Sequence, residues 1–499
     1  MKFEPTTFQK TWHSTLFVGC AALLIALSLG CNGEAELDPS ETACNWDADS
    51  DHIWGGHGAG SHNTFAAGAE GPSTLDGADS QEIAIQSWEF GGSAPSARNF
   101  FSMAVASTGM TIVLFRSQEA ETAGPTFDIH AYDSSGDEMW KTSLGEVETD
   151  TFTALINAEI SLLDDCQVGV TLEEYVHIID GHEGTVESEI ELDGITLGGL
   201  HTADDGTVSV ASNTSSDGQE LQVTVEVLSD DLDSASAIYE GDSFEFVGAT
   251  PRVVYDERTE RIFVPASYRE LTGLSPQVTG ASGVAGIDVH SGDVDTTSIP
   301  ELDDLLDSTP GLEIEPAFVA VRPFAIEGST VFFYADNTEL LFIGRADTET
   351  GDISWLGMID DLADTLDDAP AFQGTPNHII ASESNAAFSL ASQIFSIGNS
   401  GETTWTRQIS GGNWSSAATP SMVGDNSGHI YAMVGEDTGD IAIFSDHDGL
   451  EESTSPDEDW MRMRPVAVGA DASLMLEATK LDCDDDDECE ATSYLLSLW

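Results

Sequence analysis

The sequence predicts an all-β protein, an eight-bladed β-propeller of four-stranded antiparallel blades, with seven blades as the alternative. Three observations predict this fold. A turn phrase recurs at intervals of about fifty residues, prolines recur with a similar cadence, and an N-terminal segment can complete the last sheet. Repeats of this length are typical of propellers and solenoids, in which each unit buries its faces against its neighbours.

The turn phrase has an apolar strand, an aspartate, a glycine and then a tryptophan four residues after the glycine. In such a turn the aspartate accepts backbone N–H groups and the glycine takes a positive φ angle. We expect the tryptophan to cross the sheet edge and pack against the neighbouring unit. The clear copies contain Asp133, Gly136 and Trp140; Asp347, Gly351 and Trp355; and Gly401 and Trp405.

Weaker copies fill the gaps between the clear ones. They begin at Asp180, Asp288 and Asp446, and a further copy is expected near Asp230, where no glycine follows. The markers together with a C-terminal strand, 494–498, indicate eight units. The segment 82–90 is predicted to pair with this last unit, which would remove exposed sheet edges.

Prolines that recur along the chain are the second observation. A proline is tolerated at the first residue of a strand and disfavoured in its middle. We therefore predict that each proline opens a strand–turn–strand unit. The prolines are Pro251, Pro323, Pro370, Pro420 and Pro465.

The copies at 131–140 and 347–355 resemble the tryptophan-docking repeat of pyrroloquinoline-quinone-like (PQQ-like) β-propellers. The resemblance covers residues 80–499. That superfamily includes quinoprotein dehydrogenases and the lipoprotein scaffold of the outer-membrane protein assembly machinery. The resemblance implies the fold, but a fold hosts many activities.

The N-terminus predicts export and lipid anchoring. Residues 1–30 read as a signal peptide with an apolar stretch at 17–29, short for a membrane span. The segment 27–31 resembles a bacterial lipobox ending at Cys31, with Ser28 where leucine is usual. Plain secretion is the alternative. Asn32 after the cysteine favours, by analogy, the outer membrane, facing the periplasm or the exterior.

Residues 31–79 read as a flexible tether, acidic and rich in glycine, that precedes the propeller at 80–499. Three aspartates at 47, 49 and 51 have the alternate spacing of the first ligands of a calcium-binding loop. The residues that follow do not match the rest of that loop. The tether histidines His52, His57 and His62 recur every fifth residue, and a solvated linker is the preferred interpretation over a metal site.

The chain is strongly acidic, with 15 basic and 90 acidic residues and a formal charge of −75. Removing residues 1–30 takes away Lys2, Lys10 and Glu4, which leaves 13 basic and 89 acidic residues, a charge of −76. Nucleic acid is a poor partner for such a surface. The surface fits either adaptation to salty surroundings or cation binding.

Cysteine spacing predicts one disulfide. Cys483 and Cys489 bracket five acidic residues in a hairpin, and in an oxidising compartment this spacing reads as a disulfide. Cys44 and Cys166 are left over and are also candidates to pair.

Two acidic segments, 301–307 and 359–368, read as short helices before the first strands of two units. Their outward faces carry aspartates. They are either solvated loops or an acidic docking rim for a basic partner or bridging cations.

No catalytic motif is found: no nucleophile elbow, zinc helix, phosphate loop or dinucleotide fingerprint. A quinoprotein dehydrogenase would need adjacent cysteines and a haem attachment motif, and the chain has neither. We expect no catalytic residue and no cofactor, with calcium as the one bound ion left open. The predicted function is a lipid-anchored binding or scaffolding module for a protein or polysaccharide. The alternatives are a propeller enzyme and a polysaccharide-binding surface protein.

Overall fold

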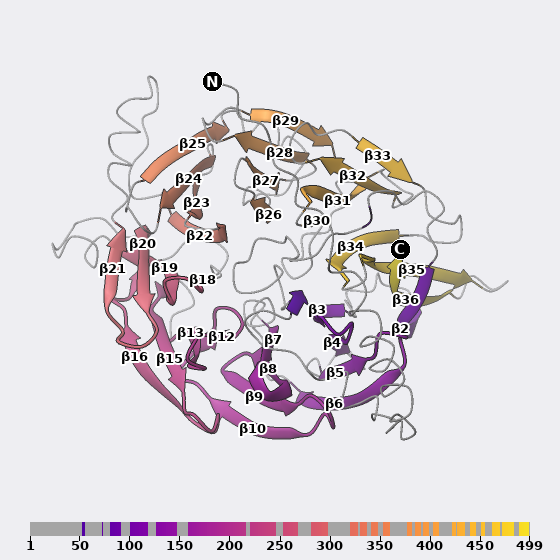
Figure 1. Ribbon diagram of the computed structural model, residues 1–499, viewed down its shortest axis with the longest axis horizontal. Coiled ribbons are helices and arrows are strands. Elements are labelled where there is room, and N and C mark those ends of the chain that lie inside the picture. Colours follow the sequence, from indigo (N-terminus) through magenta and orange to yellow (C-terminus); the bar gives the residue numbers. More distant parts are fainter. Residues whose placement is uncertain are drawn as a thin grey trace, which may run out of the picture. The chain divides into compact units, whose positions relative to one another are not determined.

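The structure is a computed structural model. It describes residues 52–54, 72, 80–90, 100–117, 126–146, 158–215, 220–245, 253–267, 281–297, 320–327, 330–336, 341–347, 353–359, 377–381, 385–390, 393–398, 403–408, 422–425, 427–434, 440–445, 451–454, 462–469, 472–483 and 489–498. The chain divides into two units, Met1–Thr42 and Ala43–Trp499. All described residues belong to the second unit, which Figure 1 traces from strand to strand.

The described strands form eight antiparallel sheets of four or five strands, here numbered in chain order, and one two-stranded ribbon. Sheet 1 contains β1 (His52–Trp54), β3 (Phe100–Ala106), β4 (Thr111–Ser117), β5 (Thr126–Tyr132) and β6 (Glu138–Glu146). Sheet 2 contains β7 (Glu159–Leu163), β8 (Gln167–Leu172), β9 (Tyr175–Asp180) and β10 (Val186–Glu191). Sheet 3 contains β11 (Ile195–Thr196), β12 (His201–Thr202), β13 (Val208–Asn213), β15 (Val223–Leu228) and β16 (Ala235–Glu240).

The next three sheets repeat this order. Sheet 4 contains β18 (Val254–Asp256), β19 (Arg261–Ser267), β20 (Ala281–Asp288) and β21 (Val294–Thr297). Sheet 5 contains β22 (Ala320–Glu327), β23 (Thr330–Asp336), β24 (Leu341–Asp347) and β25 (Ile353–Ile359). Sheet 6 contains β26 (Asn377–Ala381), β27 (Asn385–Leu390), β28 (Gln393–Gly398) and β29 (Thr403–Gln408).

The last sheets bring in the N-terminal strand. Sheet 7 contains β30 (Met422–Gly424), β31 (His429–Val434), β32 (Asp440–Ser445) and β33 (Glu451–Thr454). Sheet 8 contains β34 (Arg462–Val468), β35 (Leu474–Cys483), β36 (Cys489–Leu498) and β2 (Ser80–Phe90). The ribbon joins β14 (Glu220–Leu221) to β17 (Phe244–Glu245). Among the described residues the one helical element is the 3-10 turn Asp164–Cys166, and no helix there has the length and apolarity to cross a membrane.

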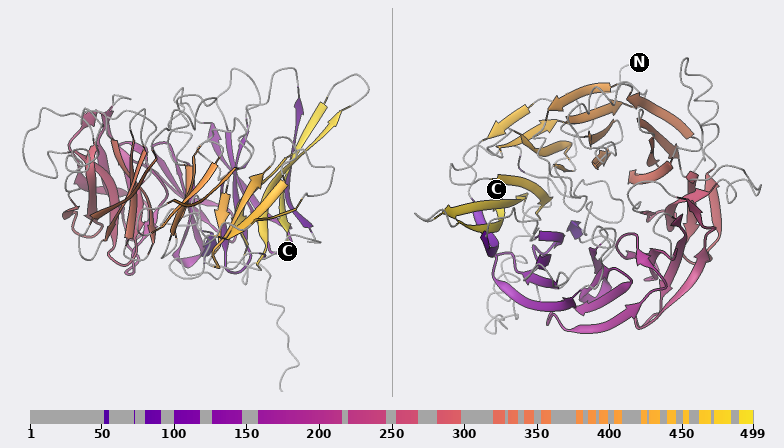
Figure 2. Two further views of the ribbon diagram at one scale, coloured as in Figure 1. Left: turned by 90° about the horizontal axis from the view of Figure 1, so that it is seen from above. Right: turned by 180° about the vertical axis from the view of Figure 1, so that it is seen from behind.

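The pairing of β2 with β36 confirms the prediction that an N-terminal strand completes the last sheet. The register runs from Ser80 opposite Leu498 to Phe90 opposite Cys489. Figure 1 and both views of Figure 2 show β2 beside the C-terminal hairpin. Strands that are far apart in sequence are therefore hydrogen-bonded in one sheet.

Burial within a sheet falls from the first strand to the fourth, as sheet 2 illustrates. Every residue of β7 is buried, whereas β10 exposes most of its side chains, including three glutamates. A strand covered on both faces reads as a continuous apolar run, and a solvated strand carries charge. The sequence of each strand therefore matches its position in the sheet.

Apolar clusters join neighbouring sheets. One cluster holds side chains of sheets 1 and 2, a second holds those of sheets 2 and 3, and a third holds those of sheets 3 and 4. The largest contains Trp405 of sheet 6, Phe444 of sheet 7, Leu476 of sheet 8 and Met103 of sheet 1. Each sheet in these clusters buries its faces against the sheets beside it, which removes apolar area from water.

The structure corrects the proline prediction at the two positions it describes. Pro323 and Pro465 lie inside the first strands β22 and β34, not before them. In both strands the register shifts directly after the proline. A proline lacks the N–H that a ladder needs, but an edge strand with a bulge tolerates it.

Two further predictions, the tether and the helix at 359–368, fall only partly on described residues. Within the segment predicted as a tether, His52–Trp54 forms β1 and pairs with β3, and Pro72 is buried. Ile359, the first residue of a predicted helix, is the last residue of β25. The rest of that helix, the helix at 301–307, the three tether aspartates, His57 and His62 lie outside the described residues.

Candidate functional site

The aspartate turns have the geometry that the sequence predicts where they are described. The Asp133 carboxylate accepts the backbone N–H groups of Ser135 (2.9 Å) and Asp137 (3.0 Å) and the Ser135 hydroxyl (2.7 Å). Gly136 has a φ of 81°. Burial tends to raise the pKa of Asp133, but the hydrogen bonds from Ser135 and Asp137 lower it, and the net pKa is lowered.

The copy near Asp230, which lacks the glycine, forms the same kind of turn from other residue types. The Ser229 hydroxyl accepts the N–H groups of Asp233 and Ser234, both at 3.2 Å. Leu232 takes the positive φ angle, 47°, that glycine takes elsewhere. A short hydroxyl side chain imitates the aspartate, although more weakly, so the turn survives without its signature residues.

Trp140 docks on the turn of the next sheet. Its indole N–H donates to the Gly181 carbonyl at 2.6 Å, and the Thr142 hydroxyl donates to the Gly184 carbonyl. Both acceptors belong to the turn between β9 and β10. A Cβ on Gly184 would lie 2.6 Å from the indole ring, so the ring lies directly against the glycine. This confirms the predicted packing of Trp140 across the sheet edge.

Trp405 packs across an edge in a related way. It lies on β29 of sheet 6, is 6% exposed, and stacks against Phe444 of sheet 7 with ring centroids 6.3 Å apart. Trp355 lies in β25, and its side chain is outside the described residues, as are Gly351 and Gly401. Asp347 is the last residue of β24. Their predicted roles stay predictions.

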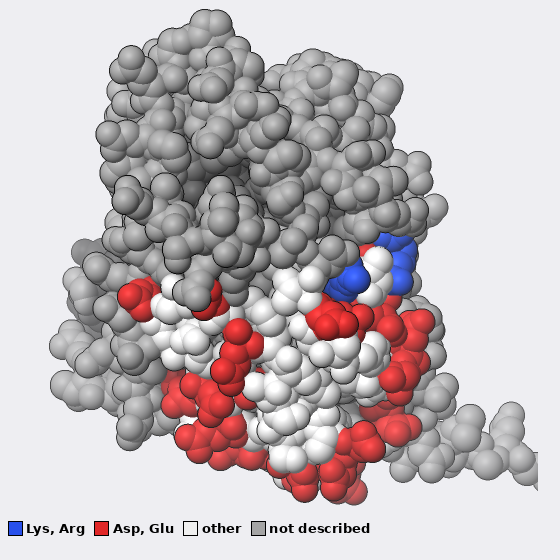
Figure 3. Space-filling model, turned by 90° about the vertical axis from the view of Figure 1, so that its left-hand side faces the viewer, with Lys and Arg blue, Asp and Glu red and all other residues white. Residues whose placement is uncertain are grey.

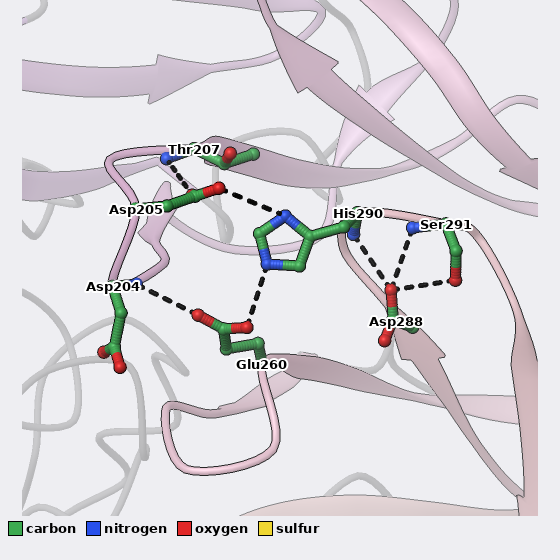
Figure 4. A network of polar contacts seen from close by, with 7 residues as sticks. All are labelled: Asp204, Asp205, Thr207, Glu260, Asp288, His290 and Ser291. Carbon is green, nitrogen blue, oxygen red and sulfur yellow. Dashed lines mark hydrogen bonds and ion pairs between the residues drawn. The ribbon is translucent and has the colours of Figure 1, made fainter.

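A histidine cluster joins sheets 3 and 4 (Figure 4). The His290 ring lies between Glu260, with Nε2 2.9 Å from Oε2, and Asp205, with Nδ1 3.7 Å from Oδ2. The Asp204 N–H donates to the other Glu260 oxygen at 3.2 Å. Asp204 and Asp205 come from the β12–β13 turn of sheet 3, and the others come from two turns of sheet 4.

The charges of this cluster favour a protonated imidazole. The hydrogen bond to Glu260 raises the pKa of His290, the small effect of burial lowers it, and the charges of Asp205, Glu260 and Asp288 raise it further. The pKa of Asp205 is lowered, mainly by the Thr207 hydroxyl and N–H and also by His290. The sequence alone had marked His290 only as part of a weak turn phrase.

Asp288 holds the turn that carries His290. Burial tends to raise the pKa of Asp288, but the N–H and hydroxyl of Ser291 and the N–H of His290 donate to its carboxylate, and the net pKa is lowered. Gly292 completes the turn with a φ of 71°. A Cβ there would lie 2.1 Å from the Ile238 carbonyl of sheet 3, so this turn also packs closely against β16.

A second cluster lies at the β30–β31 turn of sheet 7. The Asp425 side chain is fully buried, and its Oδ2 lies 2.9 Å from both His429 Nδ1 and the Tyr431 hydroxyl. The Tyr431 hydroxyl also lies 2.9 Å from the Pro72 carbonyl. Burial, helped by the Asp425 charge, raises the pKa of Tyr431. Tyr431 therefore joins Pro72 to sheet 7.

Two further histidines, His130 and His177, also face carboxylates. His130 Nδ1 lies 3.0 Å from Glu138, and His177 Nδ1 lies 3.5 Å from Glu189. Burial lowers the pKa of both imidazoles, against the opposing effect of the glutamates. Within the described part of the chain no group of three or more histidine, cysteine, aspartate or glutamate side chains has an arrangement that would hold a metal ion.

The predicted cysteine pair occupies a suitable register. Cys483 and Cys489 are directly opposite in the β35–β36 hairpin. Opposed residues of antiparallel strands have Cα atoms about 4.5–5.5 Å apart, within the range of a disulfide. Their side chains lie outside the described residues, so the bond stays a prediction, as does lipidation at Cys31. Cys166 is buried and disulfide-bonded; Cys44 is outside the described residues.

The surface of the described sheets is acidic. Figure 3 shows one side of the molecule, the side of β16 and β21, where Asp and Glu frame an uncharged area. Exposed carboxylates on or next to the strands of sheets 2 and 3 are Glu187, Glu189, Glu191, Asp193, Asp230, Asp231, Asp233, Glu240 and Asp242. Lys141, one of the four lysines of the chain, lies 3.5 Å from Asp128.

No protein-family model and no curated protein matches this chain. Its structure is similar to an oligogalacturonate lyase in complex with manganese, with 10% identity, 86% of this chain and 98% of that chain covered, and a TM-score of 0.36. It is also similar to the dihydro-heme d1 dehydrogenase NirN in complex with DHE, with 12% identity, 78% and 81% covered, and a TM-score of 0.38. Likeness at this level carries no argument about activity.

Proposed function

We propose that this chain is an exported, lipid-anchored, closed eight-bladed propeller of the PQQ-like type. We further propose that it acts as a non-catalytic binding or scaffolding module at the outer membrane. Its partner is a protein that presents basic groups.

Closure is supported by apolar packing and by strand pairing. One cluster contains side chains of sheets 6, 7, 8 and 1, so the last sheet and the first share buried surface. The β2 strand enters sheet 8 between β1 and β3, which both belong to sheet 1. Eight sheets of four or five strands fit eight blades.

The proposal of a binding role rests on the hydrogen bonds that the polar side chains make. Asp133, Asp288 and Asp425 accept N–H groups of their own turns, and His290 and His429 are held by carboxylates. These groups fix the shape of the turns. The carboxylates left at the surface are exposed, and an acidic surface attracts basic partners through its long-range field.

Export and anchoring are supported by the lipobox-like segment at 27–31 and by the cysteines. Disulfides persist in oxidising compartments, and both Cys166 and the opposed pair Cys483 and Cys489 fit such a compartment. Replacing Cys31 with serine should move the protein from the membrane fraction to the soluble fraction. A Cys31→Ser protein that stays with the membrane would contradict the anchor.

An affinity pull-down from the organism's own solubilised membranes tests the function. We expect a reproducible partner that is released by high salt, because screening weakens exposed charge pairs. A variant that neutralises three exposed carboxylates of sheet 3 (Asp230→Asn, Asp231→Asn and Glu240→Gln) should retain less of it. Parallel runs with and without chelator show whether divalent cations bridge the contact.

Two outcomes would overturn the proposal. One is the absence of any reproducible salt-sensitive partner. The other is alcohol-dependent dye reduction by the purified protein with added pyrroloquinoline quinone and calcium, which would identify an enzyme.

A further inference from the structure

The joint between sheets 3 and 4 has an ionisable group at its centre. Three turns converge there: β12–β13 from sheet 3, and β18–β19 and β20–β21 from sheet 4. Figure 4 shows the His290 ring pointing from its turn toward Asp205 on one side and Glu260 on the other.

We propose that this joint is a pH-responsive clasp, in which protonated His290 holds the β20–β21 turn against sheet 3 and neutral His290 releases it. The inference is independent of the identity of any partner. It concerns a conformational device within the fold itself.

The charges around His290 are nearly all negative. Asp205 faces it from the β12–β13 turn, Glu260 faces it from the β18–β19 turn, and Asp288 lies on its own turn. Arg258, a cation on the β18–β19 turn, has its guanidinium 3.4 Å from the buried Asp256 carboxylate. Loss of the His290 proton therefore leaves like charges facing one another, which is unfavourable.

A buried contact lies at the same joint. His201 of β12 stacks on Tyr255 of β18 with ring centroids 5.1 Å apart, and both side chains are buried. The apolar cluster shared by sheets 3 and 4 surrounds Tyr255. We therefore expect the sheets to stay together when His290 is neutral, while the turn at the surface becomes more mobile.

The pH window follows from the directions of the shifts. The folded pKa of His290 is raised above its ordinary 6.5. Its contribution is therefore complete below pH 6.5 and is lost as the pH rises through the higher folded value. The pKa values of Asp205 and Asp288 are lowered from 3.8. Their contribution is complete above pH 3.8 and is lost only as the pH falls through the lower folded values. The clasp is thus closed in mildly acidic solution and opens as the pH rises through the raised pKa of His290.

Amide hydrogen exchange of residues 288–293 in the full-length chain, corrected for the intrinsic pH dependence, tests the clasp. We expect the opening equilibrium to rise about 1.5- to 5-fold between pH 5.5 and pH 8.5, the size of effect that an exposed ion pair gives. The His290→Gln variant should be open at both pH values and show no such rise.

The chain contains a matched control. His182 occupies the same place in the β9–β10 turn, two residues after Asp180, and its N–H donates to that carboxylate at 2.8 Å. The His182→Gln variant should keep the pH dependence of residues 288–293. An NMR titration of His290 in the unmodified protein, with Glu260→Gln as a comparison, gives a readout that needs no His290 variant.

Three results would overturn the clasp. They are an opening equilibrium that does not change with pH, a pH dependence that persists in His290→Gln, and a titration midpoint for His290 at or below 6.5, the ordinary pKa of histidine. A midpoint that falls in Glu260→Gln, together with a flat profile in His290→Gln, supports it.

Discussion

Two joints between neighbouring sheets solve the same problem with different chemistry. At the joint of sheets 1 and 2, Trp140 lies on Gly184 and donates to the Gly181 carbonyl. At the joint of sheets 3 and 4, Gly292 packs on the Ile238 carbonyl, and His290 contacts Asp205 of the preceding sheet. In both, the turn after the third strand of the later sheet meets the last strand of the earlier one.

The two joints differ in their sensitivity to pH and to salt. In the contact of the Trp140 indole with Gly184 and the Gly181 carbonyl, no side chain titrates near neutral pH. The His290 joint has a group that does, and it is exposed enough for salt to screen it. A repeat protein can thus keep one geometry around its sheets while placing sensitivity to conditions at a single joint.

The largest effect is expected from removing the indole. Trp140→Ala should lower the free energy of unfolding by about 3–5 kcal/mol, because it leaves a cavity between two sheets. Urea unfolding followed by circular dichroism measures this. Trp140→Phe keeps an aromatic ring and loses only the N–H donor, so it should cost less, about 1–2 kcal/mol. Equal losses in both variants would show that packing on Gly184 contributes nothing.

The close approach at Gly184 gives the second effect. Gly184→Ala requires an alanine at a φ of 69° and places its Cβ within 2.6 Å of the Trp140 ring. Gly206 has a similar φ of 85° with nothing within 4 Å of its Cβ position, so Gly206→Ala measures the backbone strain alone. We expect Gly184→Ala to be less stable than Gly206→Ala by about 1–3 kcal/mol in the same urea experiment. Similar values for the two would contradict the close contact.

A smaller effect is expected from the hydroxyl beside Trp140. Thr142→Val removes the donor to the Gly184 carbonyl and should cost about 0.5–1.5 kcal/mol, the usual net value of one hydrogen bond. Ser143→Ala, an exposed neighbour on the same strand, is the control and should change the free energy of unfolding little. A Thr142→Val variant as stable as the control would show that this hydrogen bond does not stabilise the joint.

The smallest effect separates the two joints directly. Raising the salt concentration from 0.1 M to 1 M shortens the Debye length from about 10 Å to about 3 Å. At pH 6 this should weaken the His290 contact by less than about 1 kcal/mol and leave the Trp140 contact unchanged. Amide exchange of the β20–β21 and β9–β10 turns reads both joints in one sample. Equal salt responses in the two turns would contradict the expected difference between the His290 contact and the Trp140 contact.

Much of the local structure could be predicted from the sequence. Asp133 and Gly136 specify their turn because the carboxylate reaches nearby N–H groups and glycine accepts a positive φ. Trp140 was expected to pack across a sheet edge because a tryptophan follows each of the three clear copies of the turn. The strand at 82–90 was expected in the last sheet because joining the two ends of the chain there removes exposed sheet edges.

Other features depend on contacts that spacing does not encode. Ser229 and Leu232 build a turn without the expected residues, because the flanking strands impose the hairpin. Pro323 and Pro465 lie within strands because a bulge at an edge absorbs the missing donor. His290 looked like one more turn residue, since its partner Asp205 lies 85 positions earlier in the chain.

The sequence by itself determined the turns, the strand periodicity, the acidity and the expectation of export, because each of these depends on neighbouring residues or on composition. Only the tertiary structure decided which turn meets which sheet. It placed Asp205, Glu260 and His290 together and brought Pro72 to Tyr431. Long-range contacts are set by how whole sheets bury their faces against one another, and that packing determines which side chains become partners.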